Sequence, residues 1–482
     1  MFYSSDESVD VPTLDVLSFL FDSAYCAAKE DTPLHAEATN PINTITKAAA
    51  RKLTKQIAYT LREDFRIGLD GPGKDVVVTV SAGQSLLPIL FYGVIAAEGL
   101  FSAASPSTTP AELARQINDG PAKLLVCSAE TKDMAIEAAT LSGMPSSRVL
   151  LLQSFPEKKL ESVDGSVRCR FDEELCWRLI TAQDELRNSR ICLLYSSGTT
   201  GAPKGILLSH ENIVAEAFIP ACINRKVYEE RETRGIPSFE YRTLAHLPAA
   251  HISGVQGYFV NPFYDAGLVY WMPKFDFAQF LKHNSDLSIT TFFTVPPIYM
   301  AIARHPLVKG QFKSLKIAYC GGSSLGTDLQ AAASSKLGGG NTLISQTWGM
   351  SETTGAVTHM PPDQSDTTGS LSPLLPNMLM RLVDETGQDV PPGTPGEALL
   401  KGPMVSQGYH NNPIANASSF AQGWLRTNDM LVERGGKFYI WGRKEVRNPN
   451  NRFISLSHVD VFDMFQNRIL SGTESSKYVQ ES

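Results

Sequence analysis

The chain has 482 residues, of which 43% are hydrophobic and 19% are charged; this length exceeds one ordinary domain, and the composition is typical of a globular, water-soluble protein. Its net charge is −7, with no block of Lys and Arg, so neither nucleic acid nor an anionic membrane surface is expected as its main partner. The seven cysteines are scattered without a CxxC pair, which predicts neither a disulfide framework nor a zinc site and fits a reducing compartment.

The first lobe alternates short apolar runs with helical patterns. In chain order, the sequence predicts a strand at Asp75–Val80, a helix over residues 85–99, a strand at Leu100–Pro106, a helix over 109–119 and a strand at Ala122–Ser128. Thr109 before Pro110, with Glu112 close behind, is a helix-start signal. This alternation implies a parallel sheet that is covered by helices.

The same pattern resumes after a hydroxyl-rich segment near residue 200. Further strands are predicted at Arg242–His251, Leu287–Pro296, Leu315–Gly322 and Asn341–Gly349. Each runs into glycine, proline or polar residues at its carboxyl end, where the ligands of open α/β sheets collect. From about Gly369 onwards, short strands punctuated by Gly and Pro predict a small β-rich lobe. The expected fold class is α/β: a large multi-lobed core with helix-covered, mostly parallel sheets, plus that lobe.

The chain ends and the longest apolar run bear on cellular location. The opening MFYSSDESVD is acidic where a signal peptide is basic, and the closing VQES is not a peroxisomal signal. The apolar run Ser85–Pro106 is interrupted by proline, glycine and glutamate, so it predicts a buried helix and strand rather than a membrane span. We therefore expect a cytoplasmic protein without a membrane span; the sequence leaves the oligomeric state open.

The segment Tyr195–Val214, YSSGTTGAPKGILLSHENIV, combines hydroxyl groups, glycines and one lysine. Its glycines permit close approach of the backbone to a ligand, so that amides and hydroxyls can surround phosphate oxygens while Lys204 supplies positive charge. The spacing is not that of a Walker A loop. A flexible surface turn is the alternative interpretation, and Lys204 together with Pro203 favours phosphate binding.

This loop resembles the signature of the adenylate-forming (AMP-binding) superfamily, which includes acyl- and 4-coumarate-CoA ligases, luciferases and peptide-synthetase adenylation domains. Five further segments follow in the family's order: LPAAHISG at Leu247–Gly254, GGSSLG at Gly321–Gly326, QTWGMSETTG at Gln346–Gly355, WLRTNDM at Trp424–Met430 and YIWGR at Tyr439–Arg443. The resemblance predicts an adenylation core at 1–443, with sublobes at about 30–190, 191–345 and 346–443.

The resemblance implies a binding site for ATP and Mg²⁺. The residues expected around the phosphates are Ser196, Ser197, Gly198, Thr199, Thr200, Gly201, Lys204 and Ser351. The residues expected around the adenine are Gly322, Ser323, Ser324, Trp348, Gly349 and Met350, with the Trp348 ring stacked on the base. Glu352 and Thr200 are expected to hold Mg²⁺, a cation that prefers carboxylate, hydroxyl and phosphate oxygens.

The remaining implied roles concern the ribose and the acid. Asp429 is expected to accept hydrogen bonds from the ribose hydroxyls, and Arg443 to reach nucleotide oxygens. His251 is expected at the carboxylate end of the acyl pocket, and the expected catalytic set is Lys204, Thr200, Glu352 and His251. Each residue also has a structural interpretation: a core tryptophan, a simple turn at Gly322, a core histidine, or ordinary surface charges at Asp429 and Arg443.

The implied reaction has two steps. A carboxylate attacks the α-phosphorus of ATP and expels pyrophosphate, and a thiol, normally that of CoA, then takes the acyl group from the adenylate. The partners are thus a small carboxylic acid, ATP and CoA. The acid itself is left open by the expected pocket walls, which are His251–Gln256, Val295–Tyr299, Gly321–Ser323 and Thr347–Met350.

Two departures from the family pattern stand out. The family's Thr-Gly-Asp is Thr427-Asn428-Asp429 here, and asparagine tolerates a left-handed backbone well enough to keep the turn. After Arg443 the family continues into a mobile domain of about a hundred residues, which carries a catalytic lysine. Residues 444–482 are expected to be a short remnant or an aberrant tail, such as an unspliced intron, and Lys477 is not assigned that role. Thioester formation would then be impaired.

Two other functions compete with an acyl- or aryl-CoA ligase. An amino-acid adenylation domain that feeds a carrier protein would need an acid near His251 to hold the ammonium group, and Pro248–Tyr258 contains none. A nucleotide-binding pseudoenzyme would be consistent with the missing domain, but it would not need to keep Lys204, Glu352 and Asp429.

Overall fold

A computed structural model describes residues 2–196 and 203–444. Its first body is a seven-stranded sheet in the order β10-β9-β5-β4-β6-β7-β8. The central strands β5, β4 and β6 are parallel, as predicted, and β7 adds a further parallel strand, while β8 and β10 pair antiparallel at the edges. The bounds are β4 Val76–Val80, β5 Leu100–Ala104, β6 Ala122–Cys127, β7 Val149–Gln153, β8 Lys159–Ser162, β9 Arg190–Ser196 and β10 Lys204–Ser209.

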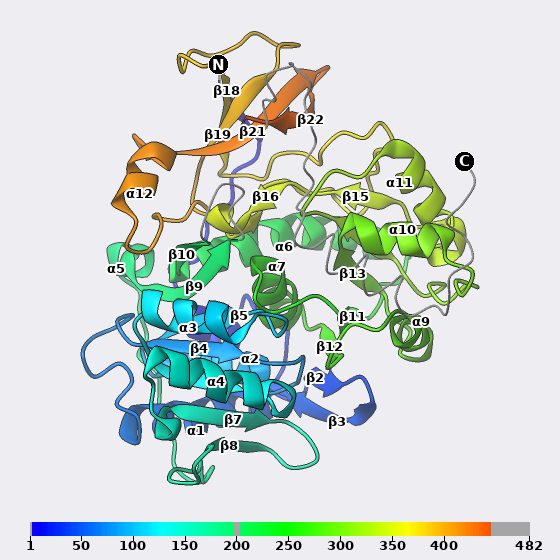
Figure 1. The fold of residues 1–482 in the computed structure, drawn as a ribbon. Coiled ribbons are helices and arrows are strands. Elements are labelled where there is room, and N and C mark those ends of the chain that lie inside the picture. The colour runs from blue at the N-terminus through cyan, green and yellow to red at the C-terminus, as the bar shows by residue number, and fades with distance from the viewer. Residues whose placement is uncertain (1, 197–202, 445–482) are drawn as a thin grey trace, which may run out of the picture.

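Helices cover both faces of this sheet (Figure 1). Successive residues of a strand point to opposite faces: Val76, Val78 and Val80 pack with α3 (Pro110–Asp119) and α4 (Lys132–Ser142). Val77 joins the main core with α1 (Lys47–Glu63) and α2 (Leu87–Ala96). The apolar run that begins at Ser85 is indeed a helix followed by a strand, and every residue of α2 and β5 is buried.

Local signals set the helix ends. Thr109 and Glu112 form the capping interaction that the sequence predicts: the Thr109 hydroxyl accepts from the Glu112 amide at 3.3 Å, and the Glu112 carboxylate accepts from the Thr109 amide at 2.9 Å. Pro110 occupies the first turn of α3, where its missing N–H costs nothing. Among the described residues, no helix is both long enough and apolar enough to cross a bilayer.

Two smaller sheets form the second body. The first has the order β11-β12-β2-β3, with β2 Pro33–Glu37, β3 Asn40–Thr46, β11 Arg242–Ala245 and β12 Leu268–Trp271. The other is parallel, β13-β14-β15, with β13 Thr291–Thr294, β14 Ile317–Cys320 and β15 Ile344–Gln346. The helices of this region are α6 His210–Thr233, α7 Ile252–Gly254, the π-helical segment η4 Val255–Val260, α8 Asn261–Tyr264, α9 Phe277–Asp286, α10 Pro296–Arg304 and α11 Thr327–Ser334.

The third body is the predicted β-rich lobe. Its antiparallel strands are β18 Leu379–Val383, β19 Gly396–Lys401, β20 Phe420–Ala421, β21 Trp424–Arg434 and β22 Lys437–Arg443, and helix α12 spans Pro413–Ser419. The N-terminal strand β1, Tyr3–Ser4, pairs with β18, so the start of the chain lies against this lobe (Figure 1). The predicted mixed α/β class is confirmed.

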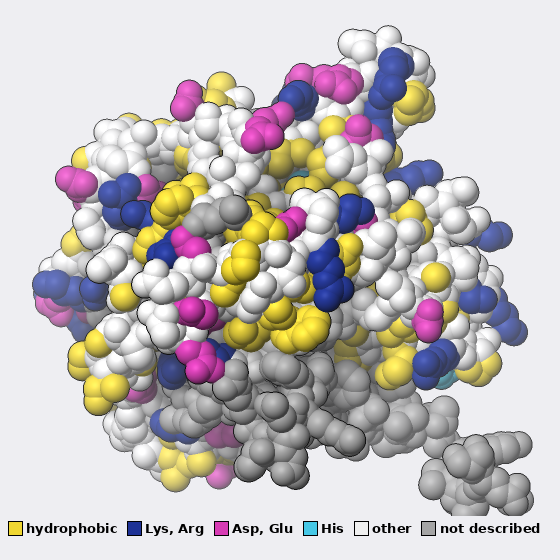
Figure 2. Space-filling view, turned by 90° about the horizontal axis from the view of Figure 1, so that it is seen from above, with side chains coloured by type: hydrophobic (Ala, Val, Ile, Leu, Met, Phe, Trp, Pro, Cys, Tyr) yellow, Lys and Arg dark blue, Asp and Glu magenta, His cyan; other side chains and the backbone are white. Residues whose placement is uncertain are grey.

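The remaining elements are short. They are η1 Ser18–Asp22, η2 Ala129–Thr131, η3 Ser146–Arg148, α5 Gln183–Asn188, η5 Gly338–Gly340, β16 Gly349–Met350, η6 Ser351–Thr353 and β17 Gly355–Ala356. Seen from above, the molecule shows hydrophobic side chains gathered near the middle of the face, with side chains of both charges spread around them (Figure 2).

Candidate active site

The predicted phosphate loop joins two paired strands. Lys204, the first residue of β10, lies opposite Ser196, the last residue of β9. The predicted phosphate ligands Ser197, Gly198, Thr199, Thr200 and Gly201 lie outside the described residues. Gly205 follows directly, and an added Cβ there would come within 2.8 Å of Leu193 Cδ1. A side chain at this position would therefore require the Leu193 side chain to move.

Lys204 and Glu352 meet at a residue that the sequence analysis missed, Tyr409. The Lys204 ammonium lies 5.2 Å from the centre of the Tyr409 ring, within the range of a cation–π interaction. The Tyr409 hydroxyl donates a hydrogen bond to Glu352 Oε1 at 2.8 Å. The residues expected to hold phosphate and Mg²⁺ thus share one tyrosine, and a carboxylate held in place is a suitable ligand for Mg²⁺ beside nucleotide phosphates.

Tyr409 reaches this position through backbone pairing. The Leu207 amide donates to the Gly408 carbonyl at 3.2 Å, and the His410 amide donates to the Gly205 carbonyl at 2.7 Å. Residues 408–410 therefore extend the edge of β10. The only sequence signal for this tyrosine is an aromatic residue after glycine in the polar stretch SQGYH, and that signal does not reveal a partner far along the chain.

Glu352 stands on a tight turn between β16 and β17. An added Cβ at Gly349 would come within 1.9 Å of the Gly355 carbonyl oxygen, and Gly355 has φ +135°. Both glycines are therefore required by the turn. The Ser406 amide donates to the Glu352 carbonyl at 2.8 Å, and Ser351, half-buried, precedes Glu352 in η6.

The predicted adenine turn lies beside the end of β15. The Thr347 amide donates to the Cys320 carbonyl at 2.8 Å, and the Leu325 amide donates to Gln346 Oε1 at 2.8 Å. These bonds place Gly322, Ser323 and Ser324 at the carboxyl ends of neighbouring parallel strands, as ligand-binding turns of such sheets are placed. Gly322 adopts φ +80°, and Gly322 and Ser324 are exposed.

Trp348, Asp429 and Arg443 form a connected group. The Trp348 indole Nε1–H donates to Asp429 Oδ2 at 2.9 Å, and Arg443 Nε pairs with Asp429 Oδ1 at 3.0 Å. The indole is only 6% exposed and packs in a hydrophobic cluster that includes Val357 and Leu375. The structure thus brings these three predicted nucleotide residues together, with the tryptophan largely in the core.

The turn before Asp429 keeps its shape without glycine. Asn428 adopts φ +60°, which confirms the prediction that asparagine can take the left-handed conformation here. The Lys444 amide donates to the Asn428 carbonyl at 2.9 Å, and the Thr427 hydroxyl accepts from the Asp429 amide at 3.1 Å. The turn before Asp429 is therefore formed with asparagine at the position where the family has glycine.

The core histidine of this region is His246, whereas His251 is half-buried. His246 contacts the Leu244 carbonyl at 2.7 Å and Thr294 Oγ1 at 2.9 Å. Burial lowers the pKa of His246 to about 4, so it stays neutral. His251 precedes α7, and its carbonyl accepts from the Gly254 amide at 2.8 Å. The core-histidine interpretation thus fits His246 better than His251.

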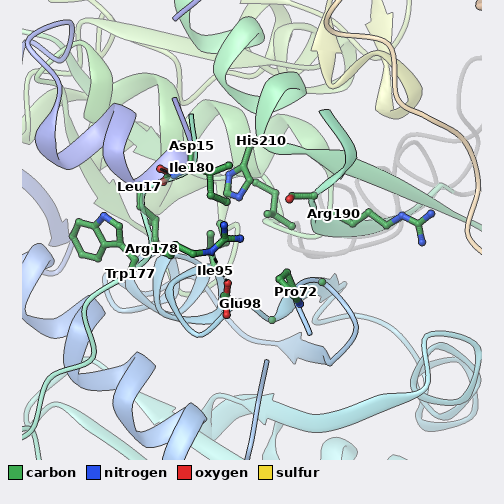
Figure 3. Close-up of a pocket in the computed structure, with 14 residues that line it drawn as sticks. Asp15, Leu17, Pro72, Ile95, Glu98, Trp177, Arg178, Ile180, Arg190 and His210 are labelled. Atoms are coloured by element: carbon green, nitrogen blue, oxygen red, sulfur yellow. Dashed lines mark hydrogen bonds and ion pairs between the residues drawn. The ribbon is translucent and has the colours of Figure 1, made fainter. Parts of the chain in front are cut away.

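A cavity of about 30 Å³ lies away from these residues, at the start of β9 and α6 (Figure 3). Such a volume holds about one or two water molecules. Its polar groups already have partners: Asp15 accepts from the Ser18 and Ile180 amides at 2.9 and 3.1 Å, and His210 Nδ1 accepts from the Val16 amide at 3.2 Å. Neither ATP nor an acid fits there.

The chain matches the family model described as AMP-binding enzyme over residues 26–410. The chain belongs to this family. It is 44% identical to a putative acyl-coenzyme A synthetase of Emericella nidulans, over 92% of this chain and 80% of that one. It is 32% identical to the phenylacetyl-CoA ligase epaB of Aspergillus niger, over 92% of this chain and 81% of that one.

The same fold occurs in a solved structure, the anthranilate CoA ligase AuaEII in complex with anthranoyl-AMP. The TM-score is 0.74 at 19% identity, over 93% of this chain and 82% of that one. The family and the acyl-CoA ligase relatives confirm the predicted reaction class: this enzyme is an AMP-forming acid–thiol ligase that activates a carboxylic acid as its acyl-adenylate and forms a CoA thioester. The alternative of an amino-acid adenylation domain is not favoured.

Proposed function

We propose that the site around Lys204, Tyr409 and Glu352 binds the triphosphate of ATP with Mg²⁺ and activates an aryl or medium-chain carboxylic acid. Lys204 would neutralise phosphate charge, and Ser351 would donate to an α-phosphate oxygen. Glu352, oriented by Tyr409, would be the protein ligand of Mg²⁺. When bound, Mg²⁺ withdraws charge from the phosphate oxygens. The observation that carries this proposal is the single tyrosine that contacts both Lys204 and Glu352.

The rest of the nucleotide would lie along the two other turns. One carboxylate oxygen of Asp429 accepts a hydrogen bond from Trp348, and the other pairs with Arg443. Each oxygen has a further lone pair that can accept from a ribose hydroxyl. Gly322, Ser323 and Ser324 would border the adenine beside Trp348, Gly349 and Met350. His251 would line the entry of the acid carboxylate. The chain would position the acid against the α-phosphorus, and this kind of positioning supplies much of the rate of phosphoryl and nucleotidyl transfer.

Two features support an aryl acid and a cytoplasmic location as parts of this proposal. One relative is named as a phenylacetyl-CoA ligase, so phenylacetate and related aryl acids form the first substrate panel. All seven cysteines are thiols in the described structure, which fits a reducing compartment. Cell fractionation with the tagged protein would test the location.

The experiment that tests the proposal follows two products. The purified chain is incubated with ATP, Mg²⁺, CoA and each acid, and pyrophosphate and acyl-CoA are measured. Lys204→Ala and Glu352→Gln should each lower acid-dependent pyrophosphate release about 100-fold or more. Lys226→Ala is the matched control, because the Lys226 side chain is 62% exposed and pairs with Glu7 on the surface. No acid-dependent pyrophosphate from any acid, or equal rates for wild type and Lys204→Ala, would refute the proposal.

A further inference from the structure

A buried polar group lies between α6 and η4, outside the nucleotide site. Its three side chains are Glu216 on α6, Gln256 in η4 and Asn261 at the start of α8. Asn261 Nδ2 donates to Glu216 Oε2 at 3.3 Å, and Gln256 Nε2 donates to the Ile213 carbonyl at 3.3 Å. Ile213 and Glu216 are three residues apart and thus lie on the same face of α6. The side-chain amides of Gln256 and Asn261 therefore both contact that face.

Two buried oxygens of this group have no partner among the described residues: Gln256 Oε1 and Asn261 Oδ1. Gln256 is 2% exposed. Its amide cannot be turned over, because its oxygen would then face the Ile213 carbonyl. Turning over the Asn261 amide would only exchange an unpartnered oxygen for an unpartnered nitrogen. A buried acceptor without a donor is destabilising, so the group is incomplete without a hydrogen-bond donor.

The helical run that carries Gln256 and Asn261 has an open side. An added Cβ at Gly257, the residue after Gln256, would meet no described atom within 4 Å. Ser253, Gly257 and Asn261 are all half-buried, and their spacing of four residues keeps them on one side of the helical run that starts after His251. Glu216 itself is 6% exposed, against 0% for Ala215. π-Helical segments such as η4 are frequent at functional sites.

The group also touches the turn that carries Glu352. An added Cβ at Gly355 would lie 2.8 Å from Glu216 Oε1. Gly355 and Ala356 form β17, which pairs with Met350 and Gly349 of β16. Glu216 is therefore one strand away from the segment predicted to border the adenylate, on the side where the helical run from His251 passes. Figure 1 shows α6 and α7 at the centre of the molecule, near β16.

We propose that Glu216, with Gln256 and Asn261, determines which acid the enzyme accepts by binding a hydrogen-bond donor, a hydroxyl or an aromatic amine, on the part of the acid remote from its reacting carboxylate. This inference rests on the proposed function. A site built to bind such a group rejects the analogue that lacks it, because the buried polar atoms are then left without partners. Burial raises the pKa of Glu216, so its neutral form can both donate to and accept from a hydroxyl.

The test compares matched acids and matched variants. Phenylacetate and cinnamate are each paired with their hydroxy and amino derivatives at every ring position, and kcat/KM is taken from pyrophosphate release. Wild type should prefer one donor-bearing isomer over its parent acid by at least about tenfold. Glu216→Leu should reduce that ratio to one or below, and Glu216→Gln, which keeps an acceptor oxygen, should give an intermediate ratio.

Controls separate specificity from folding and from the reaction itself. Glu211→Gln is the matched control, because Glu211 is on the same helix but pairs with Arg187 at the surface. Gln256→Met is a second variant that removes an unpartnered oxygen at similar volume and should also lower the ratio; ATP binding by calorimetry shows that each variant is folded. If Glu216→Leu and Gln256→Met leave the ratio of kcat/KM between the donor-bearing acid and its parent acid unchanged, this inference is wrong, while the proposed function stands. Failure of every acid in wild type would instead refute the proposed function.

Discussion

The indole N–H of Trp348 donates to the Asp429 carboxylate at 2.9 Å, which joins the second body of the molecule to its β-rich lobe. Asp429 is also paired with Arg443 at 3.0 Å, so the aspartate is held from two sides. A donor that holds a carboxylate in one orientation pre-organises it for a ligand, because the side chain then loses less conformational entropy on binding. The tryptophan then has two roles at once, as a core side chain and as an anchor for a nucleotide-binding residue.

This arrangement predicts different effects for two substitutions. Trp348→Phe keeps an aromatic ring but loses the N–H, so the dissociation constant of ATP should rise by about tenfold, as expected from the loss of one hydrogen bond to a charged group. Trp348→Ala should also lower the free energy of unfolding by about 3–5 kcal/mol, because the ring is buried. Calorimetric titration with ATP and urea denaturation measure the two effects. Trp441→Phe, at an exposed tryptophan, should change neither; an ATP affinity unaffected by Trp348→Phe would contradict the anchoring role.

Tyr409 should matter for chemistry more than for stability. Tyr409→Phe keeps the ring beside Lys204 but removes the hydroxyl that holds Glu352. We expect kcat for adenylate formation to fall about 10- to 100-fold, since hydrogen bonds to charged groups contribute about 1.5–3 kcal/mol. The Mg²⁺ concentration for half-maximal rate should rise as well. Pyrophosphate release over a Mg²⁺ titration measures both, and an unchanged Mg²⁺ dependence would show that Tyr409 does not orient Glu352.

Glu216 should make the protein less stable as the pH rises from 7 to 8. Burial raises the pKa of Glu216 to about 8, above its unfolded value, so the native state keeps a proton that the unfolded state has lost. Stability from such a group is complete below the unfolded pKa and is lost as the pH rises through the folded pKa. The loss between pH 7 and 8 should be about 1 kcal/mol.

Four other buried groups titrate below this window. Burial lowers the pKa of His210, His246 and His359 to about 4 and raises that of Asp265 to about 6. Their contributions therefore change mainly below pH 7. Urea unfolding of wild type and Glu216→Gln at pH 7.0, 7.5 and 8.0 measures the difference. Parallel pH dependences in the two proteins would show that Glu216 is ionised in the native state at pH 7.

The sequence predicts much of the fold and the turn before Asp429, because the signals for these features are local. The cap of α3, the buried helix α2 and the left-handed Asn428 each depend on residues within one turn of chain. Contacts between distant segments are different: β1 pairs with β18, β2 pairs with β12, and Tyr409 extends β10. No periodicity or spacing encodes these partners. The buried carboxyl of Glu216 was missed for the same reason, since its neighbours Asn261 and Gly355 come from α8 and β17.

The turn at Asn428 gives a direct test of backbone strain beside the nucleotide site. Its φ of +60° suits glycine and asparagine and penalises β-branched residues by about 1–2 kcal/mol. Asn428→Gly, which restores the family's Thr-Gly-Asp, should leave the ATP dissociation constant within about twofold. Asn428→Val should reduce stability by that penalty and should weaken ATP binding through Asp429, because the Asp429 amide and the Lys444 amide both depend on this turn.

Asn377→Val is a matched control, because Asn377 also has positive φ, +64°, but lies beside Val9 near the N-terminus. It should reduce stability without changing ATP affinity. Equal ATP affinities for Asn428→Val and Asn377→Val would show that the turn does not position Asp429 for the nucleotide.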